Sequence, residues 1–220
     1  MCSSDLDLRG VGGSGVPPGA DGYSLSRYAD DLVAVLDALG VREAVLCGIS
    51  MGGYVIFELL RRHPERVRAL ILADTKPQAD SADAKRGRDE LTHVAEREGQ
   101  DAVIERLLPG LLAPATQPEV AGQVREMARR WSVPALVGAL RVLRDRPDST
   151  ETLRGVRVPT LVLVGSEDKI APPETARTMA QLIPDAQYHV VPAAGHIAPL
   201  EQPLAASRLL ADFLSGLPSP

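Results

Sequence analysis

The chain has little of three features that mark other classes of protein. Its 220 residues include only two cysteines, Cys2 and Cys47, too few for a disulfide framework. Lysine and arginine number 24 against 29 acidic residues, and the net charge of −5 offers no basic surface to nucleic acid. Its apolar runs fall short of the roughly 18 residues needed to cross a membrane. These shortages argue against disulfide-rich, nucleic-acid-binding and membrane-spanning proteins.

Targeting and metal-binding patterns are also lacking. Residues 1–15 show neither the basic start nor the apolar middle of a signal peptide, so we expect a cytoplasmic protein. The histidines, cysteines and acids show no H-E-x-x-H or C-x-x-C spacing, and we expect neither a metal nor a cofactor. Cys47 is expected to pack as a small buried apolar residue. The oligomeric state stays open.

The most informative stretch present is the pattern Gly48-x-Ser50-x-Gly52. It lies between an apolar run over residues 44–47, which predicts a buried strand, and a helical pattern that starts at Met51. A serine in such a sharp turn takes strained backbone angles, which small residues two before and two after it make possible. We therefore expect Ser50 Oγ to be exposed, with the Met51 N–H directed at a developing oxyanion.

Strand and helix patterns alternate on both sides of a helical block. Alternation with few breaks predicts a mostly parallel sheet flanked by helices. An all-helical block that interrupts the alternation predicts an inserted cap. We expect the core in residues 1–75 and 151–220, and the cap in residues 76–150. The remaining predicted strands are 67–73, 160–164 and 187–191, and the predicted cap helices are 83–98, 101–108, 119–131 and 135–143, separated by Pro109, Pro114, Pro118 and Pro134.

A nucleophilic serine needs a base, and the base needs a carboxylate that orients it. Asp168 follows the predicted strand 160–164, and His196 follows the predicted strand 187–191. Ligand sites of α/β sheets lie at the carboxyl ends of strands, so both side chains are expected near Ser50. The order serine, aspartate, histidine is the order of the α/β-hydrolases.

Other residues compete for these roles. Asp74 follows the predicted strand 67–73 and is an alternative acid, as is Glu167 beside Asp168. The remaining histidines are interpreted as non-catalytic. His63 is expected at a solvated helix end, His93 on the surface, and His189 as a structural residue of a strand.

Together these stretches make the chain resemble the α/β-hydrolase superfamily from Asp7 to about Leu214. The resemblance implies that Ser50 is the nucleophile, His196 the general base and Asp168 the orienting acid, with the Met51 N–H as one oxyanion donor. Two further phrases resemble the branch that holds enol-lactonases, small-ester esterases and cofactor-free haloperoxidases. The matching stretches are 7–14, 48–53, 159–168 and 194–196, and the two phrases are 172–176 and 195–203.

The resemblance also shows a departure. Family members carry a His-Gly stretch that gives a second oxyanion N–H, and the sequence before Asp7 has none. We therefore expect the first strands of the sheet to be missing with it. Codons for residues 2–6 can spell a sequence that resembles the end of a common sequencing adapter, so we expect residues 1–6 to derive from one. The loss of one donor costs about 2.7–4 kcal/mol in the transition state, and missing strands leave an unpaired edge prone to aggregation, so we expect a chain that is weakly active, insoluble or inactive.

The expected function is hydrolysis of a small carboxylic ester or lactone through an acyl intermediate on Ser50. Acyl transfer to peroxide and a non-catalytic fragment are the alternatives. The expected partner is a small-molecule substrate, and neither nucleic acid nor a membrane. The glycine-rich stretch 10–19 lacks the lysine of a phosphate-binding loop and is interpreted as a loop that rises from a strand end.

Overall fold

The computed structural model describes residues 5–17, 19 and 22–218, and a sheet of four parallel strands forms its centre. The strands lie side by side in chain order, and each pairs in parallel with its neighbour. This confirms the predicted α/β fold. The strands are β1 (Ala44–Ile49), β2 (Val67–Ala73), β3 (Thr160–Gly165) and β4 (Gln187–Val191).

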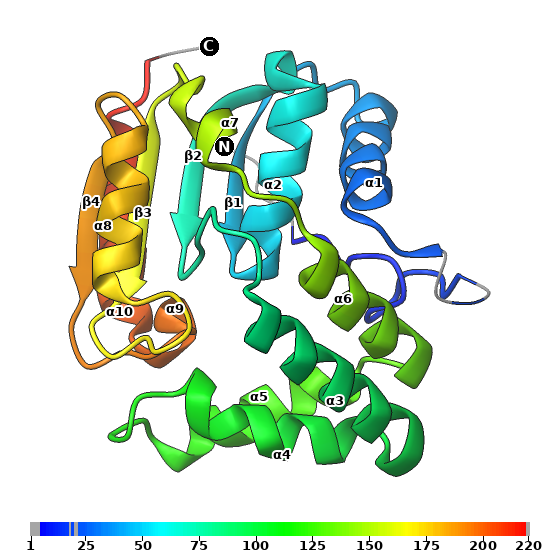
Figure 1. The fold of residues 1–220 in the computed structure, drawn as a ribbon. Helices are drawn as coiled ribbons and strands as arrows, with labels where there is room; N and C mark the ends of the chain where they lie inside the picture. Colours follow the sequence, from blue (N-terminus) through cyan, green and yellow to red (C-terminus); the bar gives the residue numbers. More distant parts are fainter. Residues whose placement is uncertain (1–4, 18, 20–21, 219–220) are drawn as a thin grey trace.

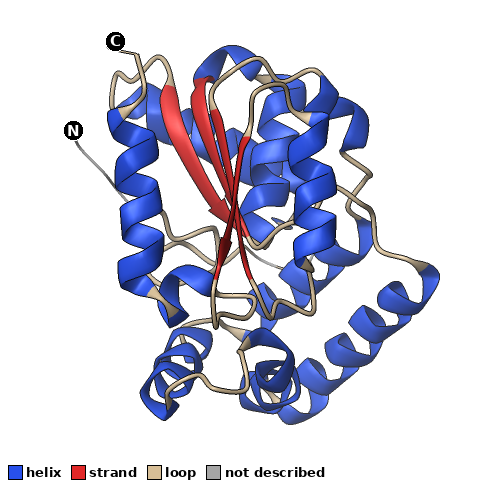
Figure 2. Ribbon diagram, turned by 90° about the vertical axis from the view of Figure 1, so that its left-hand side faces the viewer, coloured by secondary structure: helices blue, strands red, loops and turns tan. Residues whose placement is uncertain are grey.

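Helices cover both faces of the sheet (Figures 1 and 2). Side chains alternate along β2, so that Leu70 and Leu72 pack toward one face and Ile71 toward the other. Each face therefore has its own apolar cluster. The first face is covered by α1 (Leu25–Ala38), α2 (Met51–Arg62), α7 (Thr150–Arg154) and α8 (Pro173–Leu182), and the second by α10 (Pro203–Ser215).

Four further helices lie beyond the C-terminal ends of the strands, where the strand arrows point (Figure 1). They follow β2 and precede β3 in the chain, at the position of the predicted insertion, and we call them the cap. The exact division of the chain at residues 75 and 150 stays a prediction. The cap helices are α3 (Ala82–Glu98), α4 (Gln100–Leu111), α5 (Pro118–Arg129) and α6 (Val133–Asp145).

The prolines of the cap do not all separate helices as predicted. Pro109 lies inside α4, where its missing N–H removes one bond close to the end of the helix. Pro118 and Pro134 lie in the first turns of α5 and α6, where an N–H has no partner within the helix. Some elements were too short for periodicity to predict: α7, α9 (Ala198–Glu201) and a 3₁₀ turn over Pro64–Arg66.

The expected burial of the first strand was wrong. β1 is an edge strand, and most of its residues are half-buried or exposed. Cys47 is exposed as a residue. Protein atoms around its thiol still shield it partly from water, and this desolvation, with the charge of Asp5, raises the pKa of the thiol. The physical reason is that an edge strand has a neighbour on one side only, so apolar composition alone does not imply a fully covered position.

Candidate active site

Ser50 lies in the sharp turn between β1 and α2. Its backbone angles, φ 50° and ψ −112°, fall in a region that residues other than glycine rarely occupy. Two hydrogen bonds to the end of β2 hold it there: the Ser50 N–H donates to the Ala73 carbonyl at 3.0 Å, and the Thr75 hydroxyl donates to the Ser50 carbonyl at 2.9 Å. The strained turn is therefore fixed by the neighbouring strand.

Glycines let β1 and α2 pass closely, but not at both predicted positions. A Cβ on Gly48 would lie 2.6 Å from the Gly52 carbonyl carbon, so this position requires glycine. A Cβ on Gly52 would meet open space, so the prediction was wrong there. The second close approach is at Gly53, where a Cβ would overlap the Thr75 side chain. Gly53 is the buried member of the pair, next to the end of β2.

The structure brings the three predicted side chains together. His196 Nε2 lies 2.8 Å from Ser50 Oγ, and His196 Nδ1 lies 2.8 Å from Asp168 Oδ2. An ionised carboxylate can only accept, so Nδ1 carries the proton and Nε2 is free to accept the Ser50 hydroxyl proton. His196 and Asp168 are each 3% exposed. The arrangement can deprotonate a serine hydroxyl.

The environment of Asp168 keeps it ionised. Burial by itself would raise the pKa of this carboxyl, but the hydrogen bond and the charge of His196 outweigh it, and the net pKa is lowered. The second oxygen, Oδ1, accepts the Ile170 N–H at 2.8 Å and the Ala171 N–H at 2.9 Å. A carboxylate held in this way has a fixed orientation toward the imidazole ring.

Asp74, the alternative acid, makes different contacts. Its Oδ1 accepts the Gly165 N–H and its Oδ2 accepts the Ala198 N–H, both at 2.9 Å. Both oxygens are thus bonded to backbone rather than to the imidazole. Burial raises the pKa of Asp74 to about 6, against the opposing effect of these two bonds. Glu167, the other alternative, is exposed.

Met51 is the first residue of α2, as predicted for an oxyanion donor. The first N–H groups of a helix have no acceptor within it, and they carry the positive end of the helix dipole. The Met51 N–H follows the Ser50 carbonyl directly along the chain, so it lies beside the nucleophile. Its role as a donor to an oxyanion stays a prediction.

Sequence reasoning missed two side chains that support this arrangement. The Thr75 hydroxyl holds the Ser50 carbonyl, and the buried Glu201 carboxylate accepts the N–H groups of Gly195 and Ile197 on either side of His196. Thr75 directly follows Asp74, and Glu201 lies in the stretch 195–203 that carries the resemblance. Nothing in either residue type alone indicated these contacts.

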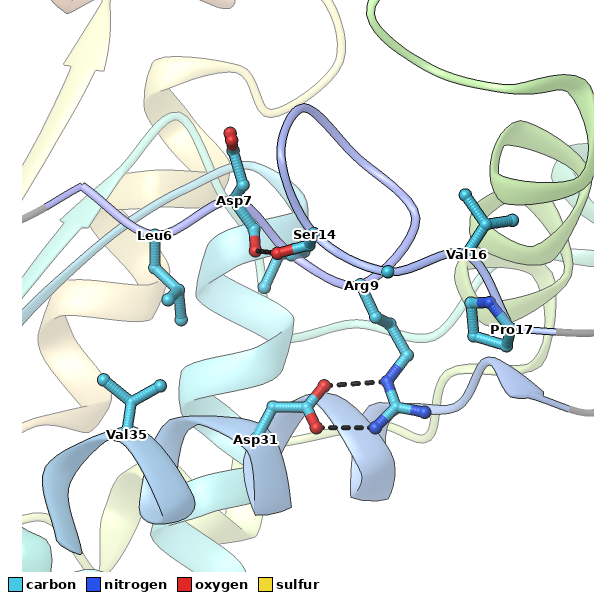
Figure 3. Close-up of a pocket in the computed structure, with 10 residues that line it drawn as sticks. Leu6, Asp7, Arg9, Ser14, Val16, Pro17, Asp31 and Val35 are labelled. Atoms are coloured by element: carbon cyan, nitrogen blue, oxygen red, sulfur yellow. Dashed lines mark hydrogen bonds and ion pairs between the residues drawn. The ribbon is translucent and has the colours of Figure 1, made fainter. Parts of the chain in front are cut away.

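A separate hollow of about 540 Å³ lies between the N-terminal loop and α1 (Figure 3). Arg9 forms a two-pronged ion pair with Asp31 there, at 2.7 and 2.5 Å. The residues that line this hollow do not include Ser50, Asp168 or His196. Across the described residues, we find no cluster of three His, Cys, Asp or Glu side chains placed to hold a metal ion. The same residues contain no helix long and apolar enough to cross a membrane.

The chain matches the model of the alpha/beta hydrolase family over residues 6–208. The chain belongs to this family. The solved structure of a thermophilic esterase from Thermogutta terrifontis is similar to this alpha/beta hydrolase, with 38% identity and a TM-score of 0.90, over 96% of this chain and 79% of that chain. An enol-lactonase from Burkholderia xenovorans LB400 is 27% identical with a TM-score of 0.84, over 94% and 78% of the two chains.

A curated protein sequence is also similar to this chain and is also a hydrolase. The 2-hydroxymuconate semialdehyde hydrolase of Pseudomonas sp. (strain CF600) is 31% identical, over 95% of this alpha/beta hydrolase and 75% of the relative. These comparisons confirm the predicted superfamily and fold class. The chain is an enzyme of the hydrolase class. The comparisons extend to hydrolases with different substrates, so membership of the family leaves the substrate open.

Proposed function

We propose that this alpha/beta hydrolase cleaves a small carboxylic ester or lactone through an acyl intermediate on Ser50. The observation that carries the proposal is the pair of 2.8 Å contacts that join Ser50 Oγ to His196 and His196 to Asp168. The similarity to an esterase and an enol-lactonase supports the substrate class.

In the first half of the reaction, Ser50 Oγ attacks the substrate carbonyl carbon while His196 Nε2 takes the hydroxyl proton. Asp168 stabilises the imidazolium that forms. The Met51 N–H donates to the oxyanion of the tetrahedral intermediate. When the intermediate collapses, the bond to the alcohol oxygen breaks and His196 returns its proton to that oxygen. The alcohol of an ester leaves, whereas the ring of a lactone opens and its new hydroxyl stays on the acyl group. In both cases the acyl group remains on Ser50.

In the second half, a water molecule takes the place of the alcohol. His196 removes a proton from the water as its oxygen attacks the acyl carbon. Collapse of the second intermediate breaks the bond to Ser50 Oγ, which recovers its proton from His196. The products are a carboxylic acid and the free enzyme. Hydrogen peroxide in place of water would give a peracid by the same steps, which is the second candidate.

The test is turnover of a chromogenic short-chain ester such as p-nitrophenyl acetate. We expect Ser50→Ala to reduce kcat by at least about 10⁴, with the residual turnover coming from substrate binding and the oxyanion donor. Ser26→Ala is the matched control, because Ser26 lies on α1 and contacts Glu58. We expect the control to stay within about twofold of the wild type, as surface substitutions generally do.

Turnover of Ser50→Ala within about tenfold of the wild type would show that another group is the nucleophile. A folded wild-type chain without turnover, and without covalent labelling by a fluorophosphonate, would favour the non-catalytic alternative. Peracid formation on addition of peroxide, at a rate above that of hydrolysis, would favour acyl transfer over hydrolysis.

A further inference from the structure

Glu201 has a buried carboxylate that the proposed reaction does not use. It ends α9 and is 9% exposed. Its Oε1 accepts the Gly195 N–H at 2.8 Å and the Ile197 N–H at 3.3 Å. These two groups lie on either side of His196 in the chain. One oxygen therefore holds the peptide unit that follows His196 and the peptide unit that precedes Gly195.

The other oxygen of Glu201 reaches the cap. Its Oε2 accepts the Ala113 N–H at 2.8 Å and the hydroxyl of Thr116. Both donors lie in the loop between α4 and α5. A single carboxylate thus joins two segments that are more than 80 residues apart in the chain.

Two other contacts tie the same segments together. The His196 N–H donates to the Leu111 carbonyl at 2.8 Å. A Cβ on Gly195 would lie 2.6 Å from the Ala113 nitrogen, so the two backbones are in close contact. The histidine loop and the cap residues 111–116 form one packed unit, with Glu201 at its centre.

A buried carboxylate is costly unless hydrogen bonds satisfy it, and here four donors surround it. Bonds to a charged acceptor are shorter and stronger than neutral ones, so this group resists displacement. Glu201 fixes the peptide unit after His196, and the bond from the His196 N–H to the Leu111 carbonyl fixes the peptide unit before it. Together these bonds set the direction of the His196 Cα–Cβ bond. That direction decides whether Nε2 lies within reach of Ser50 Oγ.

We propose that Glu201 is a positioning residue that holds His196 at bonding distance from Ser50 and fastens the histidine loop to the cap. The inference rests on the proposed function, because positioning matters only if His196 acts as the base. Glu201 is bonded to backbone N–H groups and to the Thr116 hydroxyl, and it does not touch the reacting atoms.

The test compares two isosteric substitutions, Glu201→Gln and Asp80→Asn. Asp80 is the matched control because its side chain is also buried, at 3% exposure, and also contacts the cap, through an ion pair with Arg146 at 2.7 Å. It lies at the start of the cap and makes no contact with the histidine loop. Each substitution keeps the shape of the side chain and removes one charge. We measure kcat, KM and fluorophosphonate labelling of each variant.

We expect Glu201→Gln to lower kcat about tenfold, because an amide cannot accept from both sets of donors. Its KM and its final extent of labelling should equal those of the wild type, while the rate of labelling falls with kcat. Asp80→Asn removes one partner of a buried ion pair, so we expect it to lower the melting temperature while kcat per labelled serine stays within about twofold of the wild type. Glu201→Ala should lower kcat by about 10², the effect of a displacement of about 1 Å at a reacting group.

A merely structural role would lower the extent of labelling or the melting temperature and leave kcat per labelled serine unchanged. If kcat per labelled serine is unchanged in both Glu201 variants and the wild type is active, the positioning role of Glu201 is wrong and the proposed function still stands. If the wild type shows no turnover, or if its turnover does not require Ser50, both the proposed function and the positioning role of Glu201 are wrong.

Discussion

The ends of β2 and β3 carry the same residue type in different surroundings. Asp74 follows β2 and Asp168 follows β3, and both side chains are buried at the same edge of the sheet. Asp168 contacts the His196 ring, whereas Asp74 contacts the backbone N–H groups of Gly165 and Ala198. The comparison teaches that position at a strand end does not assign a role; the partner atom does.

The pKa values of the two carboxyls differ in the same way. Burial tends to raise both, and at Asp168 the bond to His196 reverses the effect, so its pKa is lowered. At Asp74 two backbone bonds reduce the effect of burial without cancelling it, and the pKa is raised to about 6. One carboxyl is thus kept charged beside the imidazole, and the other binds a proton more readily than a free aspartate.

The largest expected effect is that of Asp168→Asn. An amide at this position no longer fixes the proton on His196 Nδ1, so Nε2 loses its role as acceptor. We expect kcat for the chromogenic ester to fall by about 10⁴, with little change in KM. Turnover within about tenfold of the wild type would contradict the assignment of Asp168 as the orienting acid.

Asp74→Asn should have a smaller effect on turnover. Its amide group cannot accept from both Gly165 and Ala198, so the loops that carry Asp168 and His196 are expected to shift slightly. We expect kcat to fall about tenfold. The two asparagine variants are assayed side by side on the same ester. If Asp74→Asn is the more damaging, the orienting acid is Asp74 and the assignment made here is wrong.

The raised pKa of Asp74 also predicts a pH dependence of stability. The folded carboxyl, with a pKa of about 6, binds its proton more tightly than an unfolded one at 3.8. Its contribution to the free energy of unfolding is therefore present at low pH and is lost as the pH rises from about 4 to about 6. The loss amounts to about 3 kcal/mol, since each pKa unit is worth about 1.4 kcal/mol.

Urea unfolding of the wild type and of Asp74→Asn, from pH 4 to pH 7, measures this effect. The difference between the two proteins removes the contribution of groups that titrate independently of Asp74. Asp168 and His196 are the titratable neighbours of Asp74. We expect the wild type to lose stability relative to the variant across the window. A constant difference would show that the pKa of Asp74 is the same in the folded and unfolded chains, and a relative gain in wild-type stability with pH would show that its folded pKa is lowered. Either result would contradict the prediction.

The smallest effect is expected at Glu167, which is adjacent to Asp168 but exposed. Glu167→Gln should leave kcat and KM within about twofold of the wild type. Because it removes a charge one residue away from the proposed acid, it separates the effect of contact from the effect of proximity. A loss as large as that of Asp168→Asn would mean that general negative charge, rather than the bond to His196, supports the reaction.

Much of the architecture could be predicted because its signals are local. The strand over 67–73 has the predicted bounds, since a short apolar run bounded by turns marks a buried strand. The strand over 187–191 also has the predicted bounds, although most of its residues are half-buried or exposed. Ser50, Asp168 and His196 could be expected to meet because each follows a parallel strand, and parallel strands end at one edge. Their distances agree with that expectation, while their catalytic roles stay a prediction.

The rest depends on contacts between distant segments. Whether Cys47 is covered depends on its strand being at the edge of the sheet, which periodicity does not reveal. The partners of Asp74 lie 91 and 124 residues away, at Gly165 and Ala198. The four donors around Glu201 likewise come from two loops. Composition and spacing cannot identify such partners, since they are set by how the loops pack.

Covalent labelling tests the central claim most directly. The wild type and His196→Ala are treated with a fluorophosphonate, and the modified peptide is identified by mass spectrometry. We expect one adduct, on Ser50 of the wild type, and a labelling rate reduced by about 10³ or more in His196→Ala. Modification of a different residue, or equal labelling of Ser50 without His196, would contradict the account of a serine activated by that histidine.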